Sequence, residues 1–253
     1  MEISTVLKKL SESPIENAWA IQDLTVWPGR AKIFYTETPI GFSYLLISGH
    51  PSQDRHPMVI LNDAGGNVES LFENLPKVPF LIRESRASIL TKIRPLYPQA
   101  IIYLEQRMDL KKSSARLATI IRARRLIEDD AAKLAEFQGA PPQAAQQMKF
   151  WIQGAVIMAV FEGDKIVSMG TTIVKTKNVW DLAAIKTSTE YRQRGYATEV
   201  VSALALEAFN NNVNSVSLTV LKNNPAAIKT YSKLGFSPME DRVWIDIGTG
   251  AKP

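Results

Sequence analysis

The chain has no cysteine and only two histidines among its 253 residues. Without cysteine it can form no disulfide bond, no thiolate metal site and no cysteine acyl-enzyme intermediate. Both histidines, His50 and His56, lie in a polar loop that also contains prolines. Because neither cysteine nor a helical histidine pair supports them, we expect no metal site. We interpret this segment as a surface loop that could still border a binding site.

Long apolar runs and two common nucleotide-binding motifs are also missing. No run reaches the roughly 18 apolar residues that span a bilayer, and Met1-Glu2-Ile3-Ser4 lacks the features of a signal peptide. We therefore expect a cytoplasmic protein with no membrane partner. The Gly-x-x-x-x-Gly-Lys loop and the Gly-x-Gly-x-x-Gly fingerprint are absent. The net charge of +5 is small and dispersed, which argues against a nucleic-acid partner.

The chain does contain enough apolar material for two packed units. Hydrophobic residues make up 45% of it, as in globular proteins with ample core. Its 253 residues exceed the common size of a single domain. The charged, polar segment 109–114 is the predicted linker. We therefore predict an N-terminal α/β domain over residues 1–112 and a second domain over residues 113–253.

Strand-like and helical patterns alternate along both halves, which predicts a mixed α/β fold. In the first half we expect helices over 1–10 and 87–97, a helix after Gly65-Gly66, and strands at 31–35, 43–47, 58–62, 79–83 and 100–106. In the second half we expect strands at 119–126, 155–161, 166–175, 179–187, 215–221 and 243–247. Helices open there at Glu128-Asp129-Asp130 and after Pro141-Pro142. The tetrapeptide Glu162-Gly163-Asp164-Lys165 between two of the strands predicts a hairpin.

The segment Arg192-Gln193-Arg194-Gly195-Tyr196-Ala197 lies between a predicted strand and a predicted amphipathic helix. A helix N-terminus offers unpaired N–H groups and about half a positive charge to an anion. Gly195 allows close backbone approach, and the two arginines can add charge-assisted hydrogen bonds. The alternative is a solvated basic turn that enters a surface helix. The short motif does not decide between them by itself.

Two motifs in the second half resemble those of a known family. The segment from Glu190 to Ala197 resembles motif A of the GCN5-related N-acetyltransferase (GNAT) superfamily, Arg/Gln-x-x-Gly-x-Gly/Ala. Downstream, Asn224-Pro225-Ala226-Ala227-Ile228-Lys229-Thr230-Tyr231-Ser232-Lys233-Leu234-Gly235-Phe236 resembles motif B. The hairpin that ends at Lys165-Ile166-Val167-Ser168-Met169-Gly170 is similar to the family's second and third strands. The resemblance covers about residues 119 to 247.

The resemblance implies the GNAT acyl-CoA N-acyltransferase fold, with a mixed central sheet, in the second half. The first half resembles the superfamily only in the order of its elements. It is similar to the domain that accompanies the transferase in two-domain members, including the glycine N-acyltransferase-like (FR47-like) group. It would be a degenerate half with an acceptor-side or structural role. We interpret Gly65-Gly66 as a turn and expect one cofactor site, in the second half.

The resemblance also implies residues that hold acetyl-CoA, the expected co-substrate. The strand that ends near Thr187 should separate from its neighbour and offer its backbone around Ile185 and Thr187 to the pantetheine arm. A backbone N–H from this strand would polarise the thioester carbonyl. The pyrophosphate contacts would come from Arg192, Gln193, Arg194, Gly195, Tyr196, Ala197 and Thr198. Asn224 would be an N-cap, a cofactor contact, or both.

Tyr231 and Asp181 are the candidate catalytic residues under this resemblance. The pKa of an ordinary tyrosine is about 10 and that of a typical thiol about 8.5, and we expect Tyr231 to donate its proton to a departing thiolate. The alternative is a tyrosine that packs beside Ile228 and Leu234. Asp181 stands where histone-type members place a catalytic glutamate, and it would act as the base through a bridging water. The alternative is an exposed strand aspartate after Trp180.

The sequence thus predicts an N-acetyltransferase that passes acetyl from acetyl-CoA to a primary amine by direct attack in a ternary complex. The acceptor would be a small molecule or a peptide, and the protein a monomer or homodimer. Two alternatives remain open. One is a transferase for a different or longer acyl-CoA, and the other is a non-catalytic module that binds coenzyme A.

Overall fold

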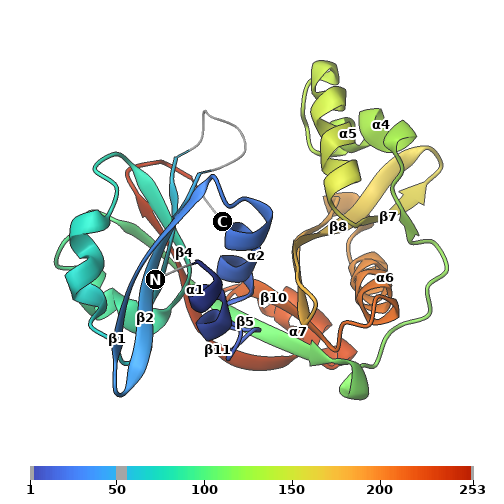
Figure 1. Ribbon diagram of the computed structural model, residues 1–253. Helices are drawn as coiled ribbons and strands as arrows, with labels where there is room; N and C mark the ends of the chain where they lie inside the picture. The colour runs from blue at the N-terminus through green and yellow to red at the C-terminus, as the bar shows by residue number, and fades with distance from the viewer. Residues whose placement is uncertain (1–2, 50–55, 252–253) are drawn as a thin grey trace. The chain divides into compact units, whose positions relative to one another are not determined.

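The computed structural model describes residues 3–49 and 56–251, and its contacts divide the chain into two compact units (Figure 1). The first unit comprises Met1–Arg107, Thr219–Asn223 and Pro238–Pro253, and the second comprises Met108–Leu218 and Asn224–Ser237. The chain passes between the units within the three strands β5 (Ile101–Lys111), β10 (Ser215–Leu221) and β11 (Ser237–Ile247). Histidine 50 lies outside the described residues, and His56 is exposed just before a strand.

In the first unit, four strands in the order β1-β2-β3-β4 continue into β11. They are β1 (Ala31–Thr38), β2 (Gly41–Ser48), β3 (Met58–Asn62) and β4 (Phe80–Arg86), with β3 and β4 parallel and the other pairs antiparallel. The helices are α1 (Ile3–Leu10), α2 (Ala18–Val26), the 3-10 helices Val68–Asn74 and Ala87–Ile89, and α3 (Leu90–Ile93). Buried apolar residues of β2, β3, β4 and the Val68–Asn74 helix form one core.

The second unit has a mixed sheet in the order β10-β9-β8-β7-β6. Its strands are β6 (Arg124–Arg125), β7 (Ile157–Glu162), β8 (Lys165–Lys175) and β9 (Val179–Thr187), and only the β9–β10 pair is parallel. Its α-helices are α4 (Ala131–Phe137), α5 (Ala145–Gly154), α6 (Tyr196–Asn210) and α7 (Pro225–Leu234). It also contains the 3-10 helices Lys112–Ser114, Glu128–Asp130, Pro142–Ala144 and Thr189–Tyr191.

Helix α6 is the element that connects the core of the second unit to its surface. It packs against β7, β8 and β9 (Figure 1), with Val200, Val201 and Leu204 buried. Apolar side chains at this spacing lie on one side of a helix and face the sheet. The N-terminus of α6 is therefore held in place by burial of the turns that follow it.

The mixed α/β fold class is confirmed, and several elements have the predicted bounds. Strands β3, β9 and β10 begin and end where the sequence predicts, and β7 and β8 form the predicted hairpin. The predicted helix over 87–97 is shorter than expected and ends at Ile93. Pro95 explains this early end because it has no backbone N–H to continue the helical hydrogen bonds, although Arg94 before it keeps helical dihedral angles.

The strand predicted over 119–126 is wrong except for the two residues of β6. The backbone N–H groups of Ile121 and Ala123 donate to the carboxylate of Glu199 at 2.8 and 2.7 Å, and that of Arg122 also donates to it. The N–H of Ala118 donates to Ser202 Oγ at 3.0 Å. Side chains on α6 thus satisfy the groups that a neighbouring strand would otherwise pair. Alternation of residues in the sequence does not reveal such partners.

The linker predicted over 109–114 is also wrong. Residues 109–111 belong to β5, and Lys112–Ser114 is a 3-10 helix. Asp109 is buried and accepts a hydrogen bond from the Ser215 hydroxyl, and Lys112 N donates to Asn214 O at 3.0 Å. Polar groups of the segment 109–114 have partners inside the fold. The polarity of the segment was therefore misread as the sign of a linker. The division into domains at residue 112 stays a prediction.

Candidate active site

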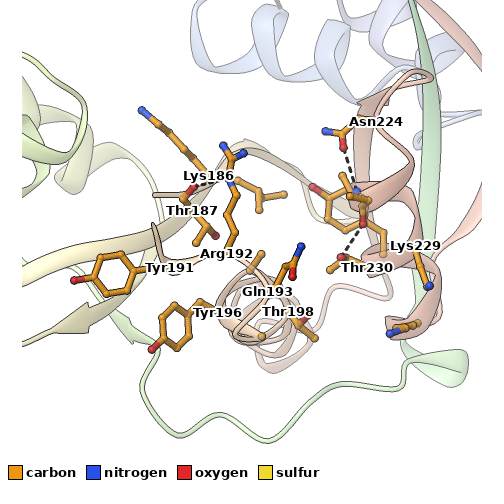
Figure 2. A pocket seen from close by; sticks show the side chains of 17 residues that line it. Lys186, Thr187, Tyr191, Arg192, Gln193, Tyr196, Thr198, Asn224, Lys229 and Thr230 are labelled. Carbon is orange, nitrogen blue, oxygen red and sulfur yellow. Dashed lines mark hydrogen bonds between the residues drawn. The ribbon is translucent and has the colours of Figure 1, made fainter. Parts of the chain in front are cut away.

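A cleft of about 940 Å³ opens in the second unit (Figure 2). Three segments line it: the end of β9, the turn that leads into α6, and helix α7. Its lining residues are Ile185, Lys186, Thr187, Tyr191, Arg192, Gln193, Gly195, Tyr196, Ala197, Thr198, Asn224, Ala226, Ala227, Lys229, Thr230, Tyr231 and Lys233. The fold therefore brings both sequence motifs to one cleft.

The end of β9 forms one wall of the cleft because its pairing with β10 stops early. The last β9–β10 pair is Leu182 with Leu218, whereas β9 continues beside β8 as far as Thr187. Ala184 has a φ of +50°, an unusual value for a residue with a side chain. The predicted separation of this strand from its neighbour is confirmed. Beyond Leu182 the edge of β9 has no partner in β10.

The turn before α6 has a left-handed backbone at two positions. Gln193 has a φ of +63° and Gly195 a φ of +82°. A Cβ atom built on Gly195 would meet no atom within 4 Å. The backbone conformation therefore favours glycine at position 195, and crowding plays no part. The space beside it is open to a ligand.

The backbone N–H groups at the start of α6 are placed where they could bind an anion. Within residues 3–49 and 56–251, no protein acceptor pairs with the N–H groups of residues 193–198. The first backbone hydrogen bond of the helix runs from Glu199 N to Gly195 O at 3.0 Å. The helix that follows has 15 residues, enough for the partial positive charge of a helix N-terminus. This arrangement can bind a phosphate group.

The two arginines of the turn differ in position. Arg192 lines the cleft, and its Nε donates to Thr187 O at 3.3 Å. Arg194 is not among the lining residues; its guanidinium donates to Glu190 O at 3.2 Å and lies 5.1 Å from the centre of the Tyr191 ring. Figure 2 shows Arg192 beside Thr187 on the β9 side of the cleft.

Two buried side chains hold the first turn of α6 in place. The Tyr196 hydroxyl donates to Glu162, and the Arg122 guanidinium lies 4.5 Å from the centre of the Tyr196 ring. Glu199, 3% exposed, accepts the N–H groups of residues 121–123. Burial acts to raise the pKa of Glu199, but these hydrogen bonds outweigh it and the pKa is lowered. Side chains thus fix the turn, and backbone groups face the cleft.

Helix α7 supplies the opposite wall. Asn224 Oδ1 accepts the N–H of Ala227 at 3.2 Å, which confirms its predicted role as an N-cap. Pro225 occupies the first helical position, and Gly235, with a φ of +99°, ends the helix. Asn224 also lines the cleft. A cofactor contact by the same residue stays a prediction.

Tyr231 lies on the wall formed by α7, and only 7% of it is exposed. Its ring centre lies 5.9 Å from that of Phe236. Burial raises the pKa of Tyr231 to about 12. The hydroxyl therefore stays protonated at neutral pH and is available there as a hydrogen-bond donor. Tyr231 is both packed and at the cleft, so the two readings of the sequence are compatible.

Asp181 does not line the cleft. It lies earlier on β9, is 1% exposed, and accepts a hydrogen bond from the Ser217 hydroxyl at 2.9 Å. The alternative reading of Asp181 as an exposed strand residue is wrong, because its side chain is buried. Its role as a base stays a prediction.

The charges around the cleft are of one sign. Four of its lining residues are cations, Lys186, Arg192, Lys229 and Lys233, and none is Asp or Glu. Sequence reasoning missed Lys186, Tyr191, Ala226, Ala227, Lys229, Thr230 and Lys233 as site residues. Helical spacing could have found part of this set, since residues 226, 229, 230 and 233 lie on one side of a helix. No pattern in the sequence indicated that Lys186 lines the cleft.

The separated strand, the anion-binding turn and the cationic lining define a protein that binds an extended, phosphate-bearing ligand. Residues 125–236 match the acetyltransferase (GNAT) family, so this part of the chain is similar to the GNAT acetyltransferases. The chain is 32% identical over 82 residues to the uncharacterized N-acetyltransferase YobR of Bacillus subtilis. That match spans 32% of this chain and 33% of the relative's length.

Solved structures match nearly the whole chain in fold. A Drosophila protein aligns over 99% of this chain and 98% of its own, with a TM-score of 0.73 and 11% identity. A GCN5-related N-acetyltransferase-like protein from Streptococcus suis aligns over 96% and 97%, with a TM-score of 0.64 and 12% identity. The GNAT fold and the resemblance to the superfamily are thereby confirmed.

Two other kinds of feature are absent from residues 3–49 and 56–251. No group of three or more His, Asp or Glu side chains is placed there to hold a metal ion. Among the same residues, no helix has both the length and the apolar character needed to cross a bilayer.

Proposed function

We propose that this GNAT enzyme transfers an acetyl group from acetyl-CoA to a primary amine by direct attack in a ternary complex. The observation that carries the proposal is the combination of three features in one cleft. These are the N–H groups at the start of α6 that no described residue accepts, the edge of β9 that β10 leaves unpaired, and the buried Tyr231. The acceptor would be a small molecule or a peptide, and all the proposed catalytic groups lie in the second unit.

The first two features fit the two ends of the donor. The pyrophosphate of acetyl-CoA would accept hydrogen bonds from the N–H groups of residues 193–198, with Arg192 as the nearby cation. The amide-containing pantetheine arm would pair with the β9 edge at Ile185 and Thr187, as an added strand does. Gly195 leaves room for the phosphates. Arg194 contacts the turn's own backbone, so we propose that it supports the turn.

The chemistry requires a neutral amine near the thioester and stabilisation of the charge that forms. The amine nitrogen attacks the carbonyl carbon, the carbon–sulfur bond breaks, and the sulfur leaves with the bonding electrons. A backbone N–H of β9 would stabilise the negative charge on the carbonyl oxygen. The nitrogen then releases a proton, and the thiolate takes one up.

The pKa of Tyr231 refines its role. Complete proton transfer from a group with a pKa of about 12 to the thiolate of a thiol with a pKa of about 8.5 is unfavourable. We therefore propose that the Tyr231 hydroxyl donates a hydrogen bond to the sulfur as its charge develops. Solvent then supplies the proton. This differs from the proton donation expected from the sequence: an ordinary tyrosine pKa of about 10 already lies above that of the thiol, and burial of Tyr231 widens the gap.

Asp181 is the proposed base, and any contact with the amine would need intervening water because its side chain is buried. If it is the base, Asp181→Asn will flatten the acidic limb of the pH profile of kcat/KM. If instead the carboxylate serves only to accept the Ser217 hydroxyl, the limb will be unchanged and the variant less stable. The pH profile and a thermal melt separate the two roles.

One experiment tests the whole proposal. Acetyl-CoA and longer acyl-CoAs are titrated into the protein by calorimetry, and a panel of amines and peptides is then screened for release of free thiol. We expect binding of acetyl-CoA and thiol release with at least one primary amine. Tighter binding and faster turnover of a longer acyl-CoA would show that this longer acyl-CoA, and not acetyl-CoA, is the donor. Binding without turnover on any acceptor would favour a non-catalytic module, and no binding would contradict the proposal.

A further inference from the structure

Two lysines on α7 lie apart from the phosphate-binding turn but line the same cleft. Lys229 and Lys233 are both exposed and are separated by one helical turn, so their side chains extend over the same surface. Figure 2 shows Lys229 on the α7 side, across the cleft from Arg192 and Lys186. The cleft therefore has cations on two walls.

The lysines on α7 differ from the other two cations in what they contact. Arg192 donates to Thr187 O, and the Lys186 ammonium lies 5.3 Å from the centre of the Phe137 ring. In the part of the chain that the structure describes, neither Lys229 nor Lys233 forms an ion pair. No carboxylate lines the cleft to compete for them. They are available to a ligand anion.

Coenzyme A carries two separate groups of negative charge, its pyrophosphate and the phosphate on its ribose 3′ oxygen. The N–H groups before α6 form a compact site that suits one of these groups. The second group needs cations at a distance from that turn. Lys229 and Lys233 are the cations that remain, and an ammonium group binds phosphate as a point charge from several directions.

We propose that Lys229 and Lys233 bind the 3′-phosphate and make the enzyme select acetyl-CoA over acetyl-dephospho-CoA. The inference rests on the proposed function, because it presumes that the turn before α6 holds the pyrophosphate. The two lysines are specificity-determining residues and take no part in the acyl transfer. Since both are exposed, the selectivity weakens as salt screens the charges.

The test compares binding of two ligands to three proteins at low ionic strength. Calorimetry measures the Kd of acetyl-CoA and of acetyl-3′-dephospho-CoA for the unaltered protein, for Lys229→Gln/Lys233→Gln, and for Lys165→Gln/Lys177→Gln. The last variant removes the same charge from two exposed lysines of the second unit that do not line the cleft. It controls for the general effect of a less positive protein.

We expect the unaltered protein and the control to bind acetyl-CoA at least tenfold more tightly than the dephospho form. The α7 variant should bind both ligands with the affinity that the unaltered protein has for the dephospho form. Equal binding of both ligands by the unaltered protein would overturn this inference and leave the proposed function standing. A preference that survives in the α7 variant would also overturn it. Failure of both ligands to bind the unaltered protein would contradict the proposed function itself.

Discussion

The chain contains two glycine turns before helices, and the structure gives them opposite characters. At Gly65-Gly66 the N–H groups of Ala64 and Gly66 donate to Ser43 Oγ at 3.1 and 2.9 Å. The carbonyl of Gly65 accepts the Thr38 hydroxyl at 2.8 Å. At Gln193-Arg194-Gly195 no described residue accepts the N–H groups. One turn uses its polar groups inside the fold, and the other leaves them for a ligand.

The space around the glycines differs in the same way. A Cβ on Gly66 would lie 2.7 Å from Ser43 Oγ, and one on the adjacent Gly41 would lie 1.5 Å from the carbonyl oxygen of Ala64. A Cβ on Gly195 would meet nothing within 4 Å. The first turn is followed by a 3-10 helix of 7 residues, the second by an α-helix of 15. Glycine permits close packing in the closed turn, Gly65-Gly66, and a left-handed backbone in the open turn, Gln193-Arg194-Gly195.

Gly195→Glu should break the open turn and has the largest expected effect. A carboxylate beside the N–H groups would repel the pyrophosphate, and the φ of +82° adds backbone strain. We expect loss of measurable acetyl-CoA binding by calorimetry with an unchanged circular dichroism spectrum. Gly139→Glu is the matched control, because Gly139 also has a positive φ, is equally open and lies outside the cleft. Retained binding in Gly195→Glu would place the pyrophosphate elsewhere.

Tyr231→Phe should separate the chemical step, measured as turnover, from binding of the donor at the open turn. It removes the proposed hydrogen bond to sulfur, and we expect turnover to fall at least tenfold with little change in acetyl-CoA affinity. Because the pKa of Tyr231 is raised to about 12, its hydroxyl stays protonated throughout the pH range 7–10. Turnover of the unaltered enzyme should therefore show no loss near pH 10 from ionisation of Tyr231. A variant with intact turnover would remove Tyr231 from the mechanism.

Gly66→Ala should damage the closed turn and leave the open one intact. The added methyl group would lie 2.7–2.9 Å from Ser43 atoms, so the strand and turn must shift. Overpacking of this kind costs about 1–3 kcal/mol. Chemical denaturation should show that loss of stability, and the Kd of acetyl-CoA should be unchanged. A changed Kd would show that the first turn takes part in donor binding.

Glu199→Gln should weaken the support beneath the open turn and lower the stability of the protein. The carboxylate accepts charge-assisted hydrogen bonds, which are worth about 1.5–3 kcal/mol each, and an amide oxygen accepts them less strongly. The lowered pKa in the folded state means that Glu199 stabilises the protein above its unfolded pKa of about 4.5. This contribution is lost as the pH falls through the lower folded pKa.

Urea unfolding at several pH values checks this prediction. The unaltered protein should lose its advantage over Glu199→Gln as the pH falls below about 4.5, because protonation removes the charge of the carboxylate. A stability difference that stays constant down to pH 3 would show that Glu199 contributes through packing alone.

The two sequence motifs predicted most of the cleft because they depend on local geometry. A glycine that must adopt a positive φ and an Asn before Pro at a helix start are visible in the sequence. The cleft includes every predicted cofactor contact except Arg194, and it includes Tyr231. Asp181 was placed by its distance along the chain from Gly195, but its side chain is buried and accepts a hydrogen bond from Ser217 on β10. The distance between two residues along the sequence does not indicate which side chains of a central strand are buried.

The errors of sequence interpretation occur where side chains replace the usual backbone partners. The segment 117–123 has the apolar residues of a strand, but Glu199 and Ser202 take up its N–H groups. Asp109 has the polarity of a linker, but Ser215 pairs with it inside the fold. In both cases the partner lies some 80 to 110 residues away in the sequence.

The sequence by itself determined the order of elements in the second unit, the glycine turn before α6 and the cap of α7, because each follows from propensities within a few residues. Only the tertiary structure decided that the β9 edge, the turn and α7 form one cleft, and that Lys229 and Lys233 belong to it. It also decided that the Gly65-Gly66 turn is closed. These properties depend on contacts between distant segments, which local patterns do not encode.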